Sequence, residues 1–293
     1  MRPTVGRFGT NHHTLDLGTF GPARPERPLA RFRGRLGRAE GCGFRVAPHR
    51  YELFADLGRP RSLRAAITRD LAGLRDVVEL TVVRPGPDGD GLDAARTAYE
   101  LTEHHYDGPL LVPALRDRWS GRVVSNHAPD VIEDLGRCFT GICTDAPSLH
   151  PAGREDEIRS LGVLFDEDIT DAAQLAGRSR AGARHAEAMD ALVATLDVVD
   201  GRLAARPYLL GGTPTAADVH LWVTLVHLDA VHRHHLTASD VHRVARRGHV
   251  WEYARRLADL PAFRDNLSRD DIARTHRDRC RGPLATGAGV TLM

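Results

Sequence analysis

Residues 208–229 read YLLGGTPTAADVHLWVTLVHLD, and this stretch decides the architecture of the second half of the chain. Thr215 and Asp218 have the spacing of a capping box, in which the hydroxyl accepts a backbone N–H of the first helical turn and the carboxylate reaches back to the cap. Such a cap stabilises a helix start by about 1 kcal/mol. The helix that follows is apolar on nearly all sides from Val219 to Leu228, which predicts the buried centre of a helical bundle.

Two further helices are expected on either side of this central one. Apolar residues within 189–203 recur at i, i+3, i+4 and i+7, which is typical of an amphipathic helix with one buried stripe. A second series of apolar residues at helical spacing occupies 250–260. We therefore predict an all-helical domain over residues 154–275, followed by a loose tail over residues 276–293.

The first half of the chain shows strand patterns and helix patterns in turn. Apolar side chains alternate over residues 51–56, a Gly-Arg-Pro turn follows at 58–60, and helical spacing continues over residues 63–74. A second apolar run at 77–83 ends in a segment rich in glycine, proline and aspartate. This order predicts a β-α-β unit with parallel strands.

A second unit follows the first. Short apolar runs at 110–115 and 123–124 predict two strands joined as a hairpin, and residues 126–135 predict a closing helix. Pro113 cannot donate to a strand ladder, so it must lie at a sheet edge or at a special peptide bond. A β-α-β unit followed by β-β-α is the thioredoxin-like order.

These patterns divide the chain into an arm, two domains and a linker. Residues 1–47 hold nine arginines against three acidic residues without sustained periodicity. They predict a basic N-terminal arm, which is either solvated or laid over a site on the body of the protein. A thioredoxin-like α/β domain is expected over residues 48–137, and a linker over residues 138–153 leads to the helical domain.

The composition excludes several functional classes. The 293 residues include 40 basic and 39 acidic side chains, a net charge of +1, so no global charge attracts nucleic acid or an anionic membrane. No apolar run approaches the length of about 18 residues that a membrane span needs. The four cysteines lack CxxC spacing, which favours neither a disulfide framework nor a cysteine zinc site. We expect a cytoplasmic protein that binds neither nucleic acid nor membrane.

Three segments carry a resemblance to a known family. They are GFRVAPHRYELF at 43–54, LVPAL at 111–115 with VVSN at 123–126, and the stretch at 208–229. Together they resemble the xi class of glutathione transferases, the glutathionyl-hydroquinone reductases. The resemblance implies a glutathione-transferase fold, with a thiol site on the first domain and an acceptor pocket between the domains. It also implies a homodimer that binds a small molecule, with glutathione or mycothiol as candidate thiol cofactors.

The resemblance fails at the residues that perform the family's chemistry. The family carries a Cys-Pro-Trp-Ala motif after the first strand, whose cysteine takes glutathione from the substrate, whereas residues 59–62 here read RPRS. A guanidinium stays protonated and is no nucleophile, so covalent chemistry at position 59 is excluded. The family's Glu-Ser pair, which holds the γ-glutamyl group, aligns with His127 and Ala128. We therefore expect weak binding of glutathione.

Other features of the family's thiol site remain. Val112 and Pro113 are expected to form a cis peptide bond that exposes the backbone N–H and C=O of Val112, and Asn126 precedes the closing helix. We predict that Val112, Pro113, Asn126 and His127 bind the ligand.

Three arginines, Arg59, Arg61 and Arg64, gather at the start of the first helix. The helix dipole makes each cation unfavourable there by a few tenths of a kcal/mol. One interpretation is an anion site, in which backbone N–H and guanidinium groups receive a carboxylate, phosphate or sulfonate. The other is that these side chains extend into water.

A group of histidines lies in and just after the central helix: His220, His227, His232, His234 and His235. Their spacing is not that of HExxH or of a zinc finger, so no metal site is predicted. His232 stands where the family has a tyrosine of the acceptor site. We predict His232 as an acid–base or hydrogen-bonding residue, with Arg59 as the second catalytic candidate. Cys42 and Ser62 are further thiol-handling alternatives, but no motif supports the first and no partner base accompanies the second.

Two functions from different classes fit these residues. The first is a diverged enzyme, a transferase or an isomerase/lyase, that acts on an anionic or quinone-like molecule in the interdomain cleft without a covalent cysteine intermediate. The second is a non-catalytic ligand-binding or partner protein on the same scaffold. A polar cleft in which His232 faces Arg59 would favour the enzyme, and a cleft filled by the arm would favour the binding protein.

Overall fold

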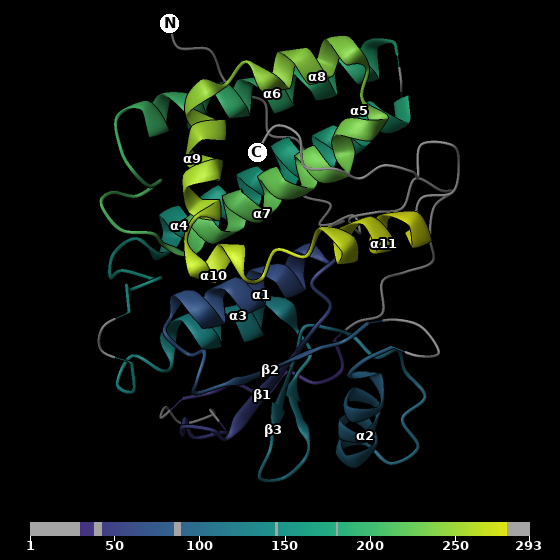
Figure 1. Cartoon of the computed structure of the whole chain (residues 1–293), viewed down its shortest axis with the longest axis vertical. Coiled ribbons are helices and arrows are strands. Elements are labelled where there is room, and N and C mark those ends of the chain that lie inside the picture. The colour runs from purple at the N-terminus through teal and green to yellow at the C-terminus, as the bar shows by residue number, and fades with distance from the viewer. Residues whose placement is uncertain (1–29, 38–42, 85–88, 144–145, 180, 280–293) are drawn as a thin grey trace, which may run out of the picture.

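The chain forms a small sheet beneath a larger set of helices (Figure 1). The structure, a computed structural model, describes residues 30–37, 43–84, 89–143, 146–179 and 181–279. The elements of the first half are β1 (Tyr51–Ala55), α1 (Pro60–Leu71), β2 (Glu79–Val82), α2 (Leu92–Thr102), β3 (Ala114–Asp117), β4 (Val123–Ser125) and α3 (Ala128–Arg137). The predicted β-α-β and β-β-α units are both present, with α2 between them.

The four strands form one mixed sheet in the order β2-β1-β3-β4. β1 pairs in parallel with β2, whereas β3 pairs antiparallel with β1 and with β4. The predicted parallel unit and the predicted hairpin are therefore confirmed, and with them the thioredoxin-like fold of this half. β3 begins at Ala114, near the end of the apolar run at 110–115 rather than at its start, because Pro113 has no N–H to donate to a neighbouring strand.

Alternation of side chains along the strands creates two separate cores. Leu53 and Leu115 belong to a cluster with apolar residues of α1 and α3. Phe54 and Val123 point the other way and belong to a second cluster with residues of α2. Because successive residues of a strand face opposite sides, α1 and α3 cover one face of the sheet and α2 covers the other, as Figure 1 shows.

The second half is helical, as predicted. Its elements are α4 (Glu155–Leu164), the π-helical segment η1 (Phe165–Asp171), α5 (Ala172–Ser179), α6 (Ala183–Ala204), α7 (Ala216–Ala230), the 3-10 segment η2 (His232–His235), α8 (Ala238–Ala245), α9 (Gly248–Ala258), α10 (Pro261–Arg264) and α11 (Arg269–Arg279). α7 is the predicted central helix, and Trp222 in its middle is completely buried. Within the described residues, no helix has both the length and the apolar character to cross a membrane.

The capping box at the start of α7 is formed, as predicted. Asp218 Oδ2 accepts the backbone N–H and the hydroxyl of Thr215, both at 2.8 Å. Its Oδ1 accepts two long-range donors, the backbone N–H of Leu209 at 2.9 Å and the hydroxyl of Tyr253 at 2.8 Å. The carboxylate therefore joins α7 to α9 as well as closing the helix start.

The two halves meet through α1. Leu63 and Ile67 on α1 belong to the main core cluster of the helical half, and α1 contacts α7. The start of α1 therefore lies beside the second domain, where the resemblance places a site. The predicted domain boundaries stay predictions, but α11 continues to Arg279 and so passes the expected beginning of the tail at residue 276.

Candidate functional site

A buried aspartate closes the turn between β1 and α1. Asp56 Oδ1 accepts the backbone N–H of Gly58 at 3.1 Å, and Oδ2 accepts Nε–H of Arg59 at 2.8 Å. Arg59 is the N-cap residue of α1, and Pro60 is the first helical residue, where its fixed φ suits the helix. The Asp56 side chain is 1 % exposed and that of Arg59 is 37 % exposed. The predicted catalytic arginine is thus held at the helix start by a carboxylate that balances its charge.

Arg64, further along α1, contacts a different domain. Its Nη1 lies 2.6 Å from Nε2 of His220 on α7, and its Nη2 lies 3.8 Å from Oδ1 of Asp166 on η1. The same Asp166 oxygen lies 2.8 Å from the imidazole nitrogen. Burial opposes ionisation of Asp166, but His220 and the charges of Arg64 and Arg61 outweigh it and lower its pKa to about 2. An ionised carboxylate therefore bridges the two domains.

The Val112–Pro113 peptide bond is cis, as expected from the sequence. The hydroxyl of Tyr99 donates to the carbonyl of Leu111 at 2.5 Å, and the Tyr99 ring meets the ring of Phe32 edge-on with centroids 5.7 Å apart. Phe32 in turn donates its N–H to Asn126 Oδ1 at 3.1 Å and accepts the Asn126 N–H at 3.0 Å. One residue of the arm therefore holds the cis-proline loop and the residue before α3 together.

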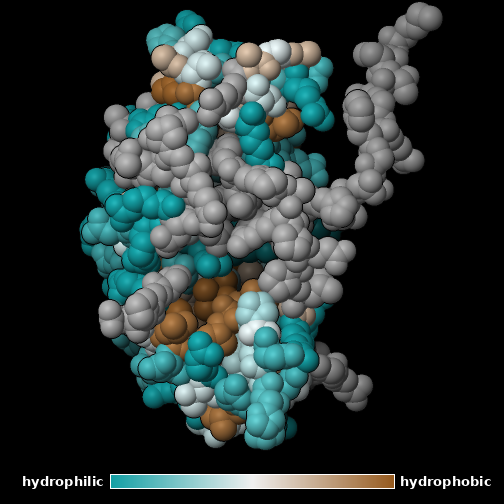
Figure 2. Space-filling model, turned by 90° about the vertical axis from the view of Figure 1, so that its right-hand side faces the viewer, coloured by the Kyte–Doolittle hydropathy of each residue, from teal (hydrophilic) through white to brown (hydrophobic). Residues whose placement is uncertain are grey.

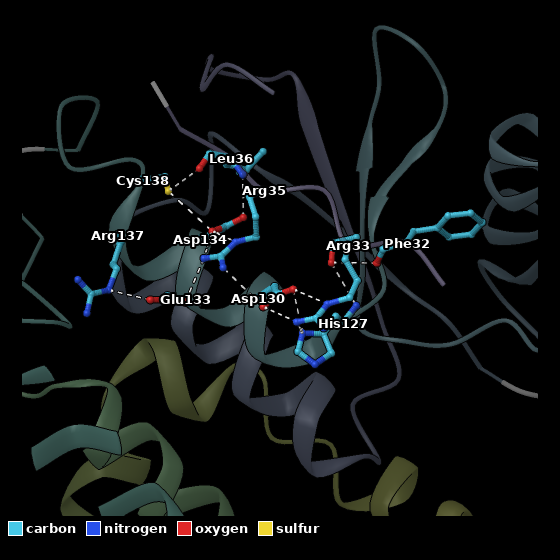
Figure 3. Close-up of polar contacts among 11 residues, drawn as sticks. Phe32, Arg33, Arg35, Leu36, His127, Asp130, Glu133, Asp134, Arg137 and Cys138 are labelled. Atoms are coloured by element: carbon cyan, nitrogen blue, oxygen red, sulfur yellow. Dashed lines mark hydrogen bonds and ion pairs between the residues drawn. The ribbon is translucent and has the colours of Figure 1, made fainter. Parts of the chain in front are cut away.

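The described arm residues 30–37 lie along β4 and α3. The N–H of Gly34 donates to the carbonyl of Val124 at 2.8 Å, and a Cβ at Gly34 would lie 2.7 Å from that oxygen, so only glycine fits this approach. Arg35 donates to Asp134 Oδ1 through Nε at 2.9 Å and through Nη2 at 2.7 Å. The arm is thus fastened to β4 by a main-chain hydrogen bond and to α3 by charged contacts, and Figure 3 shows the latter.

Arg33 of the arm reaches the predicted ligand-binding residue His127. Its Nε donates to Asp130 Oδ2 at 3.1 Å, and its Nη2 lies 3.2 Å from Nδ1 of His127. The same nitrogen of His127 lies 2.9 Å from Asp130 Oδ2. Burial opposes ionisation of Asp130, but Arg33 and His127 outweigh it and lower its pKa. Arg33 and Asp130 thus contact a predicted site residue, and neither was predicted from the sequence.

His232, the predicted acid–base residue, is buried as the first residue of η2, with 2 % of its surface exposed. Its Nδ1 has no hydrogen-bond partner among the described residues. Burial is the largest cause that lowers its pKa to about 3. The neighbours that lower it further are His227, His235, His276 and Arg178. His232 is therefore a neutral imidazole with one nitrogen left to bond.

Helix α11 connects the turn at Gly58 with these histidines. A Cβ at Gly58 would lie 2.2 Å from the Thr275 hydroxyl and 2.3 Å from the backbone oxygen of Asp271, so α11 packs directly on the turn. His276, the next residue of α11, lies 3.0 Å from His235 between their Nε2 atoms. His227 on α7 brings its Nε2 to 3.5 Å from the carbonyl of Gly58. Arg59 and His232 therefore border the same packed region, formed by the Gly58 turn, α7 and α11.

The described residues offer no metal site, since no group of three or more His, Cys, Asp or Glu has a suitable arrangement there. Two of the four cysteines are described, and both lie away from the turn. Cys138 donates to the carbonyl of Leu36 at 3.3 Å, and Cys143 donates to that of Gly73 at 3.2 Å. Cys42, considered above as an alternative thiol, lies outside the described residues.

Comparison with known proteins shows which family the chain resembles. Residues 182–256 match the model of the glutathione S-transferase C-terminal domain. The chain is 27 % identical to the glutathionyl-hydroquinone reductase YqjG of Escherichia coli over 82 % of this chain and 78 % of that protein. It is 28 % identical to the glutathionyl-hydroquinone reductase PcpF of Sphingobium chlorophenolicum over 83 % and 76 %. The glutathione S-transferase Xi of Phanerochaete chrysosporium superposes with a TM-score of 0.70 at 25 % identity, covering 86 % of this chain and 91 % of that one.

These similarities fit the glutathione transferase superfamily and its xi class. A glutathione transferase of Gordonia bronchialis agrees, with a TM-score of 0.71 at 27 % identity over 89 % of this chain and 90 % of that one. The resemblance stated from the sequence is therefore confirmed. The roles of individual site residues in this chain stay predictions.

The site residues predicted from the sequence lie in different parts of the structure. Arg59 lies at the turn under α11, while Asn126, His127 and the cis Val112–Pro113 lie around Tyr99 and Phe32. Arg64 lies apart, at the domain interface, and half-buried Arg61 adds its charge to the effect on Asp166. The predicted single cluster of three arginines is thus divided between two acidic partners, so the anion site stays a prediction.

Of the contacts that were not predicted, one has a local sequence signal and the other has none. The spacing of Asp56 and Gly58 is that of an Asx turn, a local signal that could have indicated the hydrogen bonds of Asp56 with Gly58 and Arg59. Arg33 and Asp130 are 97 residues apart, and their pairing follows only from the position of the arm on α3.

Proposed function

We propose that this chain binds a low-molecular-weight thiol, or the conjugate of such a thiol with a quinone-like or anionic molecule, between its two domains. In this proposal it transforms the ligand as a transferase without a covalent cysteine intermediate. The observation that carries the proposal is Arg59, a guanidinium fixed by buried Asp56 at the start of α1. We further propose that the protein is a cytoplasmic homodimer, as the resemblance implies.

The relatives support the ligand class. Two of them are named glutathionyl-hydroquinone reductases. One of these, YqjG of Escherichia coli, has been solved with glutathione bound, and its fold matches this chain with a TM-score of 0.72. A thiol carrying a quinone-like group is therefore the ligand that we carry over to this chain as a proposal.

The role proposed for Arg59 is electrostatic. Its guanidinium cannot attack sulfur or carbon, because it stays protonated. A fixed cation at the start of a helix stabilises a thiolate, since both the charge and the helix dipole favour the anion. Arg59 would therefore lower the pKa of a thiol bound at the turn and hold the thiolate, while the bound thiol itself supplies the sulfur.

His232 would bind the acceptor, which is the second reactant. It is neutral, buried and has an unpartnered Nδ1 among the described residues. A phenolic hydroxyl or a carbonyl of the acceptor would complete the hydrogen bonding of this imidazole. The proposed role is to hold the acceptor by a hydrogen bond to its oxygen, because an imidazole whose pKa is about 3 is a poor proton carrier at neutral pH.

A second candidate function is ligand binding without turnover. The contact of α11 with the turn favours it, because Thr275 and Asp271 lie against Gly58 where a thiol would have to enter. The closed pair of Arg59 and Asp56 favours it as well, since a cation already paired attracts an anion less strongly.

Native mass spectrometry of the full chain distinguishes these functions. The protein is incubated with glutathione, mycothiol and their quinone conjugates, and both adducts and released products are recorded. The enzyme predicts a non-covalent adduct, lost on denaturation, together with cofactor-dependent product. A binding protein gives the adduct without product. A mixed disulfide that forms on the chain during turnover would refute the mechanism without cysteine.

A further inference from the structure

The arm brings a cation to the start of α3, beside His127, which the sequence resemblance places in the thiol site. Arg33, His127 and Asp130 point toward one another there (Figure 3). Asp130 Oδ2 lies 3.1 Å from Arg33 Nε and 2.9 Å from His127 Nδ1. Its Oδ1 lies 3.5 Å from Arg33 Nη2. Arg33 is 59 % exposed, so its remaining N–H groups face solvent.

Each acidic residue of α3 has an arginine partner. Asp130 is paired with Arg33, as described above. Glu133 Oε2 and Asp134 Oδ1 lie 3.0 Å and 2.7 Å from Nη2 of Arg35, the next arginine of the arm. Arg35 also lies 3.6 Å from Asp130 Oδ1 through Nη1, and Arg137 of α3 itself lies 3.4 Å from Glu133 Oε1. Arg33 and Arg35 of the arm, together with Arg137, therefore balance the three carboxylates of this helix.

We propose that Arg33 is a specificity-determining residue of the thiol site. With Asp130 engaged and His127 beside it, this end of the site accepts a head group whose oxygens accept hydrogen bonds and disfavours a head group that ends in an ammonium. The inference rests on the proposed function and names the chemical class of thiol that the site takes. Two kinds of thiol share this chemistry, one that ends in a carboxylate and one that ends in a hydroxylated sugar.

The physical reason is the inventory of donors and acceptors. An ammonium has three donors and no acceptor, so it needs a carboxylate or a carbonyl. Beside Arg33 it meets another cation and loses water without gaining a partner, which is unfavourable. A carboxylate or hydroxyl oxygen at the same place accepts a charge-assisted hydrogen bond from the guanidinium.

Calorimetric titration of the full chain tests the inference with a matched pair of ligands. The pair is S-hexylglutathione and its analogue in which the α-ammonium is replaced by hydrogen. We expect the deaminated analogue to bind about tenfold more tightly, since only the unpaired ammonium differs. S-hexylmycothiol, which has sugar hydroxyls and no free ammonium, is the third ligand, and binding tighter than that of S-hexylglutathione also supports the inference.

The outcomes separate the inference from the proposed function. If none of the three ligands binds at millimolar concentration, the proposed function fails and the inference with it. If all bind but S-hexylglutathione binds most tightly, the proposed function stands and the inference is overturned.

Two arm variants assign the preference to Arg33. Arg33→Gln frees Asp130 to receive an ammonium, so we expect the preference for the deaminated ligand to disappear, while Arg33→Lys retains it. Arg31→Gln is the matched control, because it removes an arm arginine whose carboxylate partners are Glu103 and Asp107 rather than Asp130. Circular dichroism and melting confirm that each variant is folded. An unchanged preference in Arg33→Gln, or an equal shift in Arg31→Gln, would overturn the assignment.

Discussion

Replacing His232 by glutamine should remove a pH-dependent loss of stability. Burial lowers the pKa of His232 from an ordinary 6.5 to about 3, so between these values the unfolded chain binds a proton that the folded chain does not. Stability therefore falls as the pH falls through 6.5, and the loss grows until the pH reaches about 3. One pH unit corresponds to about 1.36 kcal/mol, so this single histidine should cost about 2 kcal/mol at about pH 5.

Urea unfolding followed by circular dichroism at about pH 8 and about pH 5 measures the effect. The wild-type chain should lose about 2 kcal/mol more than His232→Gln between these two conditions. His242→Gln, which replaces an exposed imidazole on α8, is the control and should behave as the wild type. Equal losses in the wild type and in His232→Gln would show that His232 is not held neutral by burial, and its proposed role as a neutral hydrogen-bonding residue would be refuted.

Three further substitutions test other parts of the structure. Gly58→Ala should lower the free energy of unfolding by about 1–3 kcal/mol, because its Cβ would lie 2.2 Å from Thr275 Oγ1. Gly201→Ala in α6 meets nothing within 4 Å and should raise it by about 0.5–1 kcal/mol. Thermal melts that rank the two variants the other way would contradict the packing of α11. Asp166→Asn should lower the free energy of unfolding by about 1 kcal/mol at neutral pH, after allowance for a side chain that is 35 % exposed. Unfolding measured at decreasing pH should show the wild type more stable than the variant above about pH 4. This difference should disappear as the pH falls through 2. Tyr253→Phe should lower the free energy of unfolding by about 1–2 kcal/mol, because buried Asp218 loses a donor at 2.8 Å; an unchanged urea midpoint would show that this hydroxyl does not stabilise α7.

Local patterns predicted the scaffold because its signals lie within a few residues of one another. The capping box needs only Thr215 and Asp218, three positions apart, and both of its hydrogen bonds are present. The other donors to Asp218, Leu209 and Tyr253, come from segments that only the folded chain brings near. A sequence can thus indicate that a carboxylate starts a helix without indicating that it also ties two helices together.

The candidate site was harder to predict because its charges pair across the fold. Proximity in the sequence grouped Arg59 with Arg64, yet Arg59 bonds to Asp56 three residues away and Arg64 lies against a carboxylate of the second domain. The burial of His232 was equally hidden, since the segment around it is rich in polar residues and reads as a surface. Its neighbours come from separate elements, namely Arg178 of α5, His227 of α7 and His276 of α11, and the sequence pattern placed His276 in the tail.

The pairing of these arginines has a consequence for how the site recognises a ligand. Arg59, Arg33 and Arg64 each lie within 4 Å of an aspartate, namely Asp56, Asp130 and Asp166. Each of these three places is therefore rich in fixed donors but not in net charge, and long-range attraction of an anion is weak because each cation is compensated nearby. Under the proposed function, selectivity comes from the directions of the remaining N–H groups, which favour oxygen acceptors at particular positions. The same argument explains how a chain of net charge +1 can carry arginines at all three places: the acidic residues that fix the arginines in place also cancel their charge.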